Sequence, residues 1–471
     1  MSKQQEASGL ARITTGNAEL DSILHGGFPA NSLNIIMGEP GSGKTVMAEH
    51  LIFANAKAGD RPILYLTTLS EPLEKMVHYL QQFTFFDEEL LVSGAVIYDS
   101  IGEELQKQGV SALMPKLKEV IKTLSPKIVV VDSFKAIHDL ATSVAEMRRM
   151  LYEVSGLLAA YETTAFLVGE YGEEMIASFP EFAVADGMVA LARKKTGLRD
   201  ERYLRVLKLR GSGYQEGLHA FRINATGMAV HPRLTSPEVP ANYESNEVRV
   251  PTGVSAMDTM LKGGFLAGSS TLIQGPTGSG KTTLALQFIL EGLRQGEQCL
   301  YVNFQENPTQ LSRQIKSLGG NVTGPEAKGL HRLYTSPVEL QIDSIVLELF
   351  QTIQKHKIKR VAVDALGDLV AAAGDPQRLL NYLYALLQHL VVGGVTSVLT
   401  LETIGAGGFP GRIEQAFAGQ MSAFSDAILG LDVERKGDST RRILRVVKAR
   451  GTEHDMNVRE LKITSNGVEV V

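Results

Sequence analysis

Two octapeptides in this chain have the residue types and spacing that bind phosphate. Residues 38–45 (GEPGSGKT) and 275–282 (GPTGSGKT) both match the pattern G-x-x-x-x-G-K-[ST]. The glycines let the backbone fold around phosphate oxygens, the lysine reaches the β- and γ-phosphates, and the threonine hydroxyl binds Mg²⁺. The predicted nucleotide-binding residues are Gly38, Gly41, Ser42, Gly43, Lys44 and Thr45, and in the second copy Gly275, Gly278, Ser279, Gly280, Lys281 and Thr282.

An aspartate ends an apolar segment downstream of each motif. Residues 128–132 read IVVVD and residues 361–364 read VAVD. In phosphate-binding sites of this kind, such an aspartate holds Mg²⁺ beside the threonine of the loop. An aspartate that merely caps a turn is the alternative interpretation. We predict that Asp132 with Thr45, and Asp364 with Thr282, hold the metal ion.

Hydrolysis also requires a carboxylate that orients or deprotonates the attacking water. In the second half, the strand expected next to the one that ends in aspartate is followed by Glu306. In the first half, the corresponding strand is followed by Glu71, which lies one residue further from its strand than Glu306 does. A solvated loop glutamate is the alternative for both. Glu170 and Glu402 end the next strand of their halves and are candidates for sensing the γ-phosphate or positioning water.

A lysine and an arginine two residues apart recur late in each half. Lys208 with Arg210, and Lys448 with Arg450, are each followed by glycine. Residues i and i+2 of a strand point to the same side, so each pair presents two cations together. A solvated basic face is the alternative, but cations supplied by a neighbouring subunit can accelerate phosphoryl transfer by roughly 10³- to 10⁵-fold. We expect this role in a ring with nucleotide at each subunit junction.

These landmarks show that the chain is a tandem repeat. Lys44 and Lys281 are 237 residues apart (281 − 44), and Asp132 and Asp364 are 232 apart (364 − 132). The run at 235–247 (TSPEVPANYESNE) is typical of a linker. We predict an N-terminal tail at 1–11, a first domain at 12–234, the linker, and a second domain at 248–471.

Strands and helices alternate within each half. Segments rich in Val, Ile and Leu at 32–37, 127–132, 270–274 and 360–364 read as buried strands, and 203–210 and 442–450 read as hairpin arms packed onto the sheet. Apolar strands bounded by helices indicate a parallel sheet covered on both faces. The predicted fold is therefore α/β, formed twice, each time as a mainly parallel sheet flanked by helices.

The composition is that of an ordinary globular protein, with 44% hydrophobic and 21% charged residues. The net charge of −5 does not favour bulk attraction to nucleic acid. A polar start (MSKQQEASGL), the single cysteine, and the interruption of the apolar run at 379–401 by Gly393 and Gly394 predict a cytoplasmic protein that is not in a membrane.

Taken together, the motifs resemble those of the KaiC family, bacterial clock-type proteins. The resemblance rests on both phosphate loops, the entry segments DSILHGGF and DTMLKGGFL, the two aspartates and both K-x-R-G arms. It implies two RecA-like P-loop domains, ATP and Mg²⁺ as ligands, and a double-ring homo-hexamer with ATP between subunits. In that family the first ring is a slow ATPase and the second phosphorylates itself on a neighbouring Ser-Thr pair.

The chain departs from the family pattern at its presumptive catalytic positions. The family has a Glu-Glu pair after the second strand, where this chain has Gln305-Glu306 and, in the first half, Leu69-Ser70 followed by Glu71. Ser422 matches the first phospho-acceptor, but Ala423 has no hydroxyl.

Three functional interpretations follow. The first is a KaiC-like hexameric ATPase with Ser422 as candidate autophosphorylation site, acting as a signalling or assembly switch with protein partners still unknown. The second is a RecA- or RadA-like DNA-handling ATPase, although the loop at 171–180 is acidic and that at 404–412 is Gly-rich with one arginine. The third is a scaffold that ATP holds together with negligible turnover.

Overall fold

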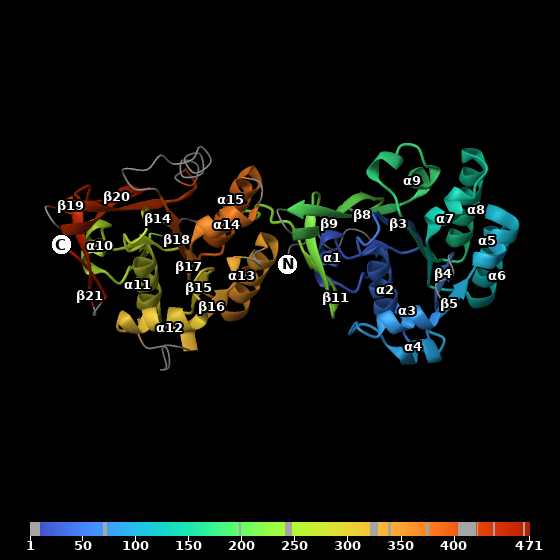
Figure 1. Cartoon of the computed structure of the whole chain (residues 1–471), viewed down its shortest axis with the longest axis horizontal. Coiled ribbons are helices and arrows are strands. Elements are labelled where there is room, and N and C mark those ends of the chain that lie inside the picture. The colour runs from blue at the N-terminus through green and yellow to red at the C-terminus, as the bar shows by residue number, and fades with distance from the viewer. Residues whose placement is uncertain are drawn as a thin grey trace. The chain divides into compact units, whose positions relative to one another are not determined.

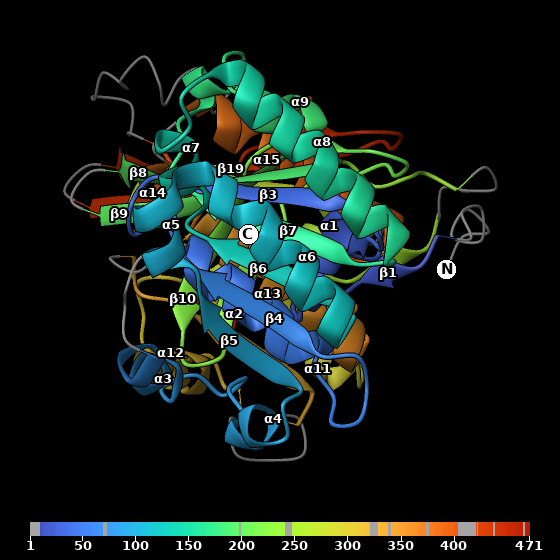
Figure 2. The ribbon, with the colours of Figure 1, turned by 90° about the vertical axis from the view of Figure 1, so that its right-hand side faces the viewer.

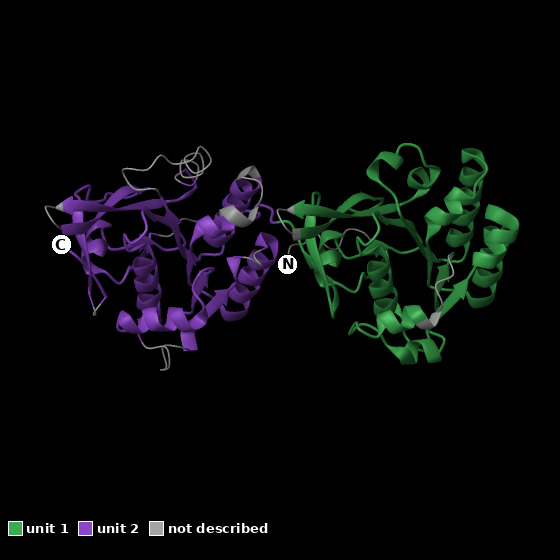
Figure 3. Ribbon diagram, in the orientation of Figure 1, with its two compact units in different colours: residues 1–233 green, residues 234–471 purple. Residues whose placement is uncertain are grey.

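The structure is a computed structural model that describes residues 10–68, 73–196, 199–240, 247–320, 328–337, 341–373, 376–403, 421, 423–436, 439–464 and 467–471. Glu71 and Ser422, predicted from the sequence as catalytic carboxylate and phospho-acceptor, lie outside the described residues. The chain forms two compact units, Met1–Arg233 and Leu234–Val471 (Figure 3). Each is described by itself.

Unit 1 is built on a nine-stranded sheet with the order β11-β10-β9-β8-β3-β7-β6-β4-β5. The strands from β8 to β5 run parallel, and β9, β10 and β11 continue the sheet antiparallel. Figure 2 looks onto this sheet, with β3, β7, β6, β4 and β5 following one another. The strands are β3 Leu33–Gly38, β4 Ile63–Thr67, β5 Val96–Ser100, β6 Ile128–Asp132, β7 Thr164–Gly169, β8 Gly187–Thr196, β9 Arg199–Leu209, β10 His219–Asn224 and β11 Gly227–His231.

Helices cover both faces of this sheet (Figure 1). Alternate residues of β3 point to opposite faces, so Ile35 joins one hydrophobic core and Ile36 the other. Helices α1–α4 pack on the Ile36 face and α5–α8 on the Ile35 face. The helices are α1 Ala18–Ile23, α2 Lys44–Asn55, α3 Leu73–Leu80, α4 Glu88–Val92, α5 Gly102–Gln108, α6 Leu113–Leu124, α7 Phe134–Asp139, α8 Val144–Ala160 and α9 Pro180–Val184.

Unit 2 repeats this plan, with the sheet order β16-β15-β17-β18-β14-β19-β20-β21-β22. Helices α10–α12 pack on one face and α13–α15 on the other. Its strands are β14 Ser270–Gly275, β15 Cys299–Asn303, β16 Leu330–Tyr334, β17 Arg360–Asp364, β18 Thr396–Glu402, β19 Ala427–Lys436, β20 Ser439–Ala449, β21 Arg459–Thr464 and β22 Gly467–Val470. Its helices are α10 Ser255–Met260, α11 Lys281–Arg294, α12 Pro308–Ser317, α13 Ile342–His356, α14 Leu366–Ala373 and α15 Pro376–Val392.

A short two-stranded sheet precedes each unit's main sheet in the chain. It pairs β1 (Arg12–Ile13) with β2 (Phe28–Pro29) in unit 1, and β12 (Arg249–Val250) with β13 (Phe265–Leu266) in unit 2. Both units are therefore α/β domains with a mainly parallel sheet flanked by helices, which confirms the predicted fold class. Among the residues that the structure describes, none of the helices is long and apolar enough to cross a bilayer.

The hairpin arms differ from the prediction. They do not pack onto the sheet but extend it, because β9 pairs with β8 and β20 pairs with β19 along nearly their whole length. Backbone hydrogen bonds continue the sheet there, and the register shifts by one residue between Met188 and Val189 and between Ile428 and Leu429, where Leu207 and Val447 of the arms have no partner in the register.

Candidate nucleotide-binding sites

Each phosphate-binding motif joins the central strand of its sheet to a helix. β3 ends at Gly38 and α2 begins at Lys44, while β14 ends at Gly275 and α11 begins at Lys281. The residue before each helix is a glycine with φ of 108° in unit 1 and 105° in unit 2. A β-carbon on Gly43 would also lie 2.8 Å from Ile223 Cδ1. The backbone conformation of this turn therefore favours glycine, and the side chain of Ile223 would have to shift to admit a β-carbon.

The two loop lysines are buried and turn back onto their own loops. Lys44 Nζ donates to Glu39 O at 2.9 Å, and Lys281 Nζ donates to Pro276 O at 2.9 Å. Burial lowers the pKa of both lysines, while Glu170 and Glu402, the glutamates predicted near the γ-phosphate, act to raise it. A desolvated ammonium surrounded by backbone N–H groups is a strong site for a polyanion.

Asp132 lies at the end of β6, next to the phosphate loop. Its Oδ2 accepts hydrogen bonds from Thr45 Oγ1 at 3.0 Å and from the hydroxyl of Tyr65 at 2.7 Å. Burial raises the pKa of Asp132, and the hydrogen bonds from Tyr65 and Thr45 lower it. The cleft around it is lined by Gly41, Gly43, Lys44, Thr45, Val46, Asp132, Ser133, Glu170 and Ile223.

Unit 2 has the corresponding cleft. Asp364 ends β17, where Oδ2 accepts from the Tyr301 hydroxyl at 2.8 Å and Oδ1 accepts from Thr400. Glu402 accepts a hydrogen bond from Thr277 of the phosphate loop. The cleft is lined by Thr277, Gly278, Lys281, Thr282, Asn303, Gln305, Glu306, Asp364, Ala365 and Glu402.

Glu306 is held in position within this cleft. Asn303 Nδ2 donates to its backbone carbonyl at 2.6 Å, and Gln314 of α12 donates to its Oε1. Its buried Oε2 has no hydrogen-bond partner among the described residues. Burial raises the pKa of Glu306, with Asp364 adding to the effect. Its neighbour Gln305 donates to Asp368 Oδ1 at 3.1 Å.

The oxygen ligands fit a magnesium ion. Mg²⁺ prefers one or two protein oxygens, with water and phosphate completing its octahedral shell. A threonine hydroxyl and a carboxylate meet beside the phosphate loop in unit 1, and both line the cleft in unit 2. No cluster of three or more His, Cys, Asp or Glu side chains occurs in the described part of the chain, so a metal held entirely by such side chains has no site there.

The lysine–arginine pairs lie away from their own phosphate loops. In the sheet, Lys208 of β9 pairs with Met188 of β8, and Met188 pairs with Ile35 of β3. Ile35 lies near the beginning of β3, whereas the phosphate loop follows the end of β3. Lys208 Nζ donates to the carbonyls of Phe182 and Ala183, both at 3.3 Å.

The cation pair of unit 2 makes similar contacts. Lys448 Nζ donates to Ser425 O and Arg450 donates to Ala423 O, both at 2.7 Å. The cations of a unit and the phosphate loop of the same unit are therefore at different ends of the sheet.

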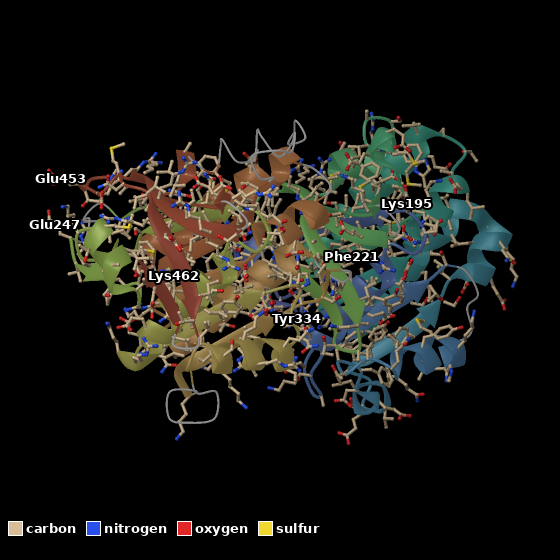
Figure 4. The ribbon with its side chains drawn as sticks, turned by 60° about the vertical axis from the view of Figure 1, so that its left-hand side comes forward. Lys195, Phe221, Glu247, Tyr334, Glu453 and Lys462 are labelled. Atoms are coloured by element: carbon tan, nitrogen blue, oxygen red, sulfur yellow. The ribbon has the colours of Figure 1, made fainter. Side chains whose placement is uncertain are left out.

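Sequence reasoning missed several side chains near the sites. Tyr65 and Tyr301 occupy corresponding places in the two repeats (ILYLT and CLYVN), a recurrence that could have identified them. Arg442 of β20 donates to Gly278 O at 2.8 Å, next to the phosphate loop. Phe221, labelled in Figure 4, lies on β10, and its ring would be 3.6 Å from a β-carbon on Gly43.

The tyrosine hydroxyls should set the metal affinity of both sites. Replacing Tyr65 or Tyr301 by phenylalanine removes a hydrogen bond that orients the aspartate, and outer-shell changes of this kind typically cost 10- to 100-fold in metal affinity. We expect the Mg²⁺ concentration for half-maximal phosphate release to rise by about that factor. Tyr79→Phe, at a position that is 52% exposed, is the matched control. Unchanged Mg²⁺ dependence in both site variants would contradict this role.

Glu49 distinguishes the first site from the second. It lies one helical turn after Thr45, is fully buried, and accepts a hydrogen bond from the Tyr98 hydroxyl at 2.6 Å. Burial raises its pKa from 4.5 to about 8, and Asp132 adds to the effect. The corresponding residue of unit 2 is Leu286.

The raised pKa predicts a pH-dependent stability. Between pH 4.5 and about 8 the folded chain holds a proton on Glu49 that the unfolded chain has released. The free energy of unfolding should therefore fall as pH rises through this window, by about 1 kcal/mol per pH unit. Glu49→Gln should remove this slope in urea denaturation followed by circular dichroism, and Glu88→Gln, at an exposed position of α4, should not. An identical slope in wild type and Glu49→Gln would refute the assignment.

A phosphate loop, a strand-end aspartate that lines the same cleft as the loop threonine, and a mainly parallel α/β sheet are all present twice and define a tandem P-loop ATPase of RecA-like fold. The family model described as "ATPase: KaiC" matches residues 13–235 and 250–471. The chain therefore belongs to the KaiC family.

Characterised relatives are similar over nearly the whole chain. The circadian clock oscillator protein KaiC of Picosynechococcus sp. is 29% identical over 484 residues, which cover 98% of this chain and 90% of the relative. KaiC 1 of Synechocystis sp. is 29% identical with 98% and 89% covered, and the circadian clock protein KaiC2 of the same organism is 27% identical with 100% and 83% covered.

Proposed function

We propose that this protein is a magnesium-dependent ATPase that assembles as a hexameric double ring, with ATP at every subunit junction in both layers. One protomer supplies the phosphate loop, and the adjacent protomer supplies the lysine–arginine pair. The observation that carries the proposal is the placement of those pairs at the other end of the sheet from their own phosphate loops. In a ring, the lysine–arginine pair of one copy of the chain can approach the phosphate bound by the next copy, although it lies away from the phosphate loop of its own unit.

The roles of the residues follow from their contacts. Lys44 and Lys281 would exchange their loop carbonyls for β- and γ-phosphate oxygens, which are stronger acceptors. Thr45 with Asp132, and Thr282 with Asp364, would hold the magnesium ion, which neutralises phosphate charge when bound. These assignments give both units the same binding chemistry.

The attacking water has a candidate base in unit 2. Glu306 has one oxygen held by Gln314 and the other without a partner among the described residues, and burial raises its pKa, which makes it a better base. In unit 1, Glu170 lines the cleft, and Glu71 remains a prediction outside the described residues.

Serine kinase activity of the second ring is a further part of the proposal. The relatives are named circadian clock proteins, and by analogy we assign this chain a switching role in signalling or assembly. Incubation with labelled ATP should label Ser422. Absence of incorporation would remove the kinase activity from the proposal, and labelling that persists unchanged in Ser422→Ala would remove Ser422 as its acceptor.

Native mass spectrometry with and without Mg-ATP tests the assembly. The proposal predicts the mass of six chains when Mg-ATP is present, and a protein that remains monomeric at saturating nucleotide would contradict it. Two assays decide between the alternatives. Salt-sensitive DNA binding would favour a DNA-handling ATPase, and six-chain rings without phosphate release would favour the scaffold.

A further inference from the structure

A buried carboxyl group lies beneath the cation pair of unit 1. Glu181 of α9 is fully buried, and its Oε1 lies 2.9 Å from Nδ1 of His138 on α7. The imidazole also stacks on the Phe179 ring, with 3.9 Å between ring centroids. Burial raises the pKa of the nearby Tyr171, and Glu181 adds to the effect. A carboxylate buried to this degree requires such partners.

The helix that contains Glu181 also supports the cations. The carbonyls of Phe182 and Ala183, the next two residues, accept the hydrogen bonds of Lys208. Arg210 donates to Ala183 O at 3.5 Å and forms an ion pair with Asp186 at 3.2 Å. Both cationic groups therefore contact carbonyls of α9.

His138, the partner of Glu181, belongs to a helix that begins close to the nucleotide site. α7 begins two residues after Asp132, the predicted metal aspartate, and its Phe134 and Ile137 are buried in the core beneath the sheet. The His138–Glu181 pair thus joins a helix that begins beside the predicted metal aspartate to the short helix whose carbonyls contact the cations.

Unit 2 is built differently at the corresponding positions. Counting from the strand-end aspartates, His138 corresponds to Val370, and counting from Asp186 and Asp426, Glu181 corresponds to Met421. Met421 is fully buried, and the carbonyls of Ala423 and Ser425 nearby accept from Arg450 and Lys448. The carbonyl support of the cations is common to both units, whereas the ionisable pair beneath it belongs to unit 1.

We propose that His138 and Glu181 are positioning residues of the first ring: they fix α9, and through it aim Lys208 and Arg210 at the nucleotide held by the neighbouring protomer. This inference rests on the proposed function. Breaking a buried pair by removing one partner leaves an uncompensated polar group that shifts its surroundings. A misplacement of about 1 Å at a catalytic group can cost 10²-fold in rate. The loss should appear in the site of the adjacent protomer.

Mixed rings can test where the effect appears. A donor protomer carries Lys44→Ala, so that its own first site is inactive but its cations are intact. An acceptor protomer carries Lys208→Ala with Arg210→Ala, so that its phosphate loop is intact but it supplies no cations. The mixture should release more phosphate than the two proteins measured separately. This excess comes from junctions at which the phosphate loop of an acceptor meets the cations of a donor. Native mass of the mixture shows that both variants share rings.

His138→Val is then placed in one partner at a time. In the donor it should lower the excess phosphate release by about 10- to 100-fold; in the acceptor it should leave the excess unchanged. Adding Glu181→Met to the donor gives both positions the residue types that the sequence of unit 2 has there, and should restore most of the excess, because no unpaired carboxyl group remains.

The outcomes separate the two proposals. Equal losses from donor and acceptor placement would show a general effect on folding and would overturn the positioning role, as would an unchanged excess with the donor variant. Absence of any excess in the parent mixture, with shared rings present, would instead overturn the proposed junctional site itself.

Discussion

Replacing both Lys208 and Arg210 by alanine should lower phosphate release from the first site by roughly 10³- to 10⁵-fold, the range found for cations supplied across a subunit junction. The measurement is made in a Lys281→Ala background, which silences the second site. Nucleotide affinity should change much less than turnover, because the phosphate loop of each protomer remains intact. A loss that appears in turnover with binding retained indicates an interaction made in the transition state.

A matched control for this variant lies on the same hairpin. Lys194 and Lys195 are exposed residues of β8, and Lys195 is labelled in Figure 4. Replacing both by alanine removes the same charge and should leave turnover unchanged. If this control lost as much activity as the Lys208/Arg210 variant, net charge would explain the effect. Full activity of the Lys208/Arg210 variant would refute the assigned role.

The second large effect is expected from the loop lysines. Lys44→Ala and Lys281→Ala each remove a charge-assisted contact to phosphate, worth up to about 3 kcal/mol, or roughly 10²-fold in affinity. Because each lysine is buried in its own loop, each variant should lose one bound nucleotide per chain and keep the other. Equilibrium binding and phosphate release measured on both variants would apportion the activity between the two units.

Lys57→Ala, at an exposed position just after α2, serves as the control and should retain both nucleotides. Retention of full binding in Lys44→Ala or in Lys281→Ala would contradict the nucleotide sites assigned here. Loss of both nucleotides in either single variant would show that one site depends on the other.

The fold was predictable from the sequence because its signals are local and occur twice. The phosphate loops have a fixed pattern, and an apolar run leads directly to Asp132 and to Asp364. The duplication excluded chance matches. The error concerned the hairpin arms, because alternation of residues in a strand does not reveal whether that strand packs onto a sheet or extends it.

The surroundings of the site were harder to predict. Tyr65 reaches Asp132 from the neighbouring strand, and Glu49 meets Tyr98 across 49 residues of sequence, so neither contact forms a local pattern. His138 and Glu181 are 43 residues apart (181 − 138) and meet because α9, which packs against α8, lies within reach of His138 of α7. Long-range polar contacts of buried residues follow from the packing of elements, which the spacing of residues in the chain does not specify.

The most direct test is a cryo-EM map of the protein with Mg²⁺ and a non-hydrolysable ATP analogue. The account predicts a ring in which Lys208 and Arg210 of one protomer, and Lys448 and Arg450 in the second layer, lie about 3 Å from γ-phosphate oxygens bound by the neighbour's Lys44 or Lys281. A map in which these four side chains remain on the backbone carbonyls of their own chain, far from any triphosphate, would contradict it.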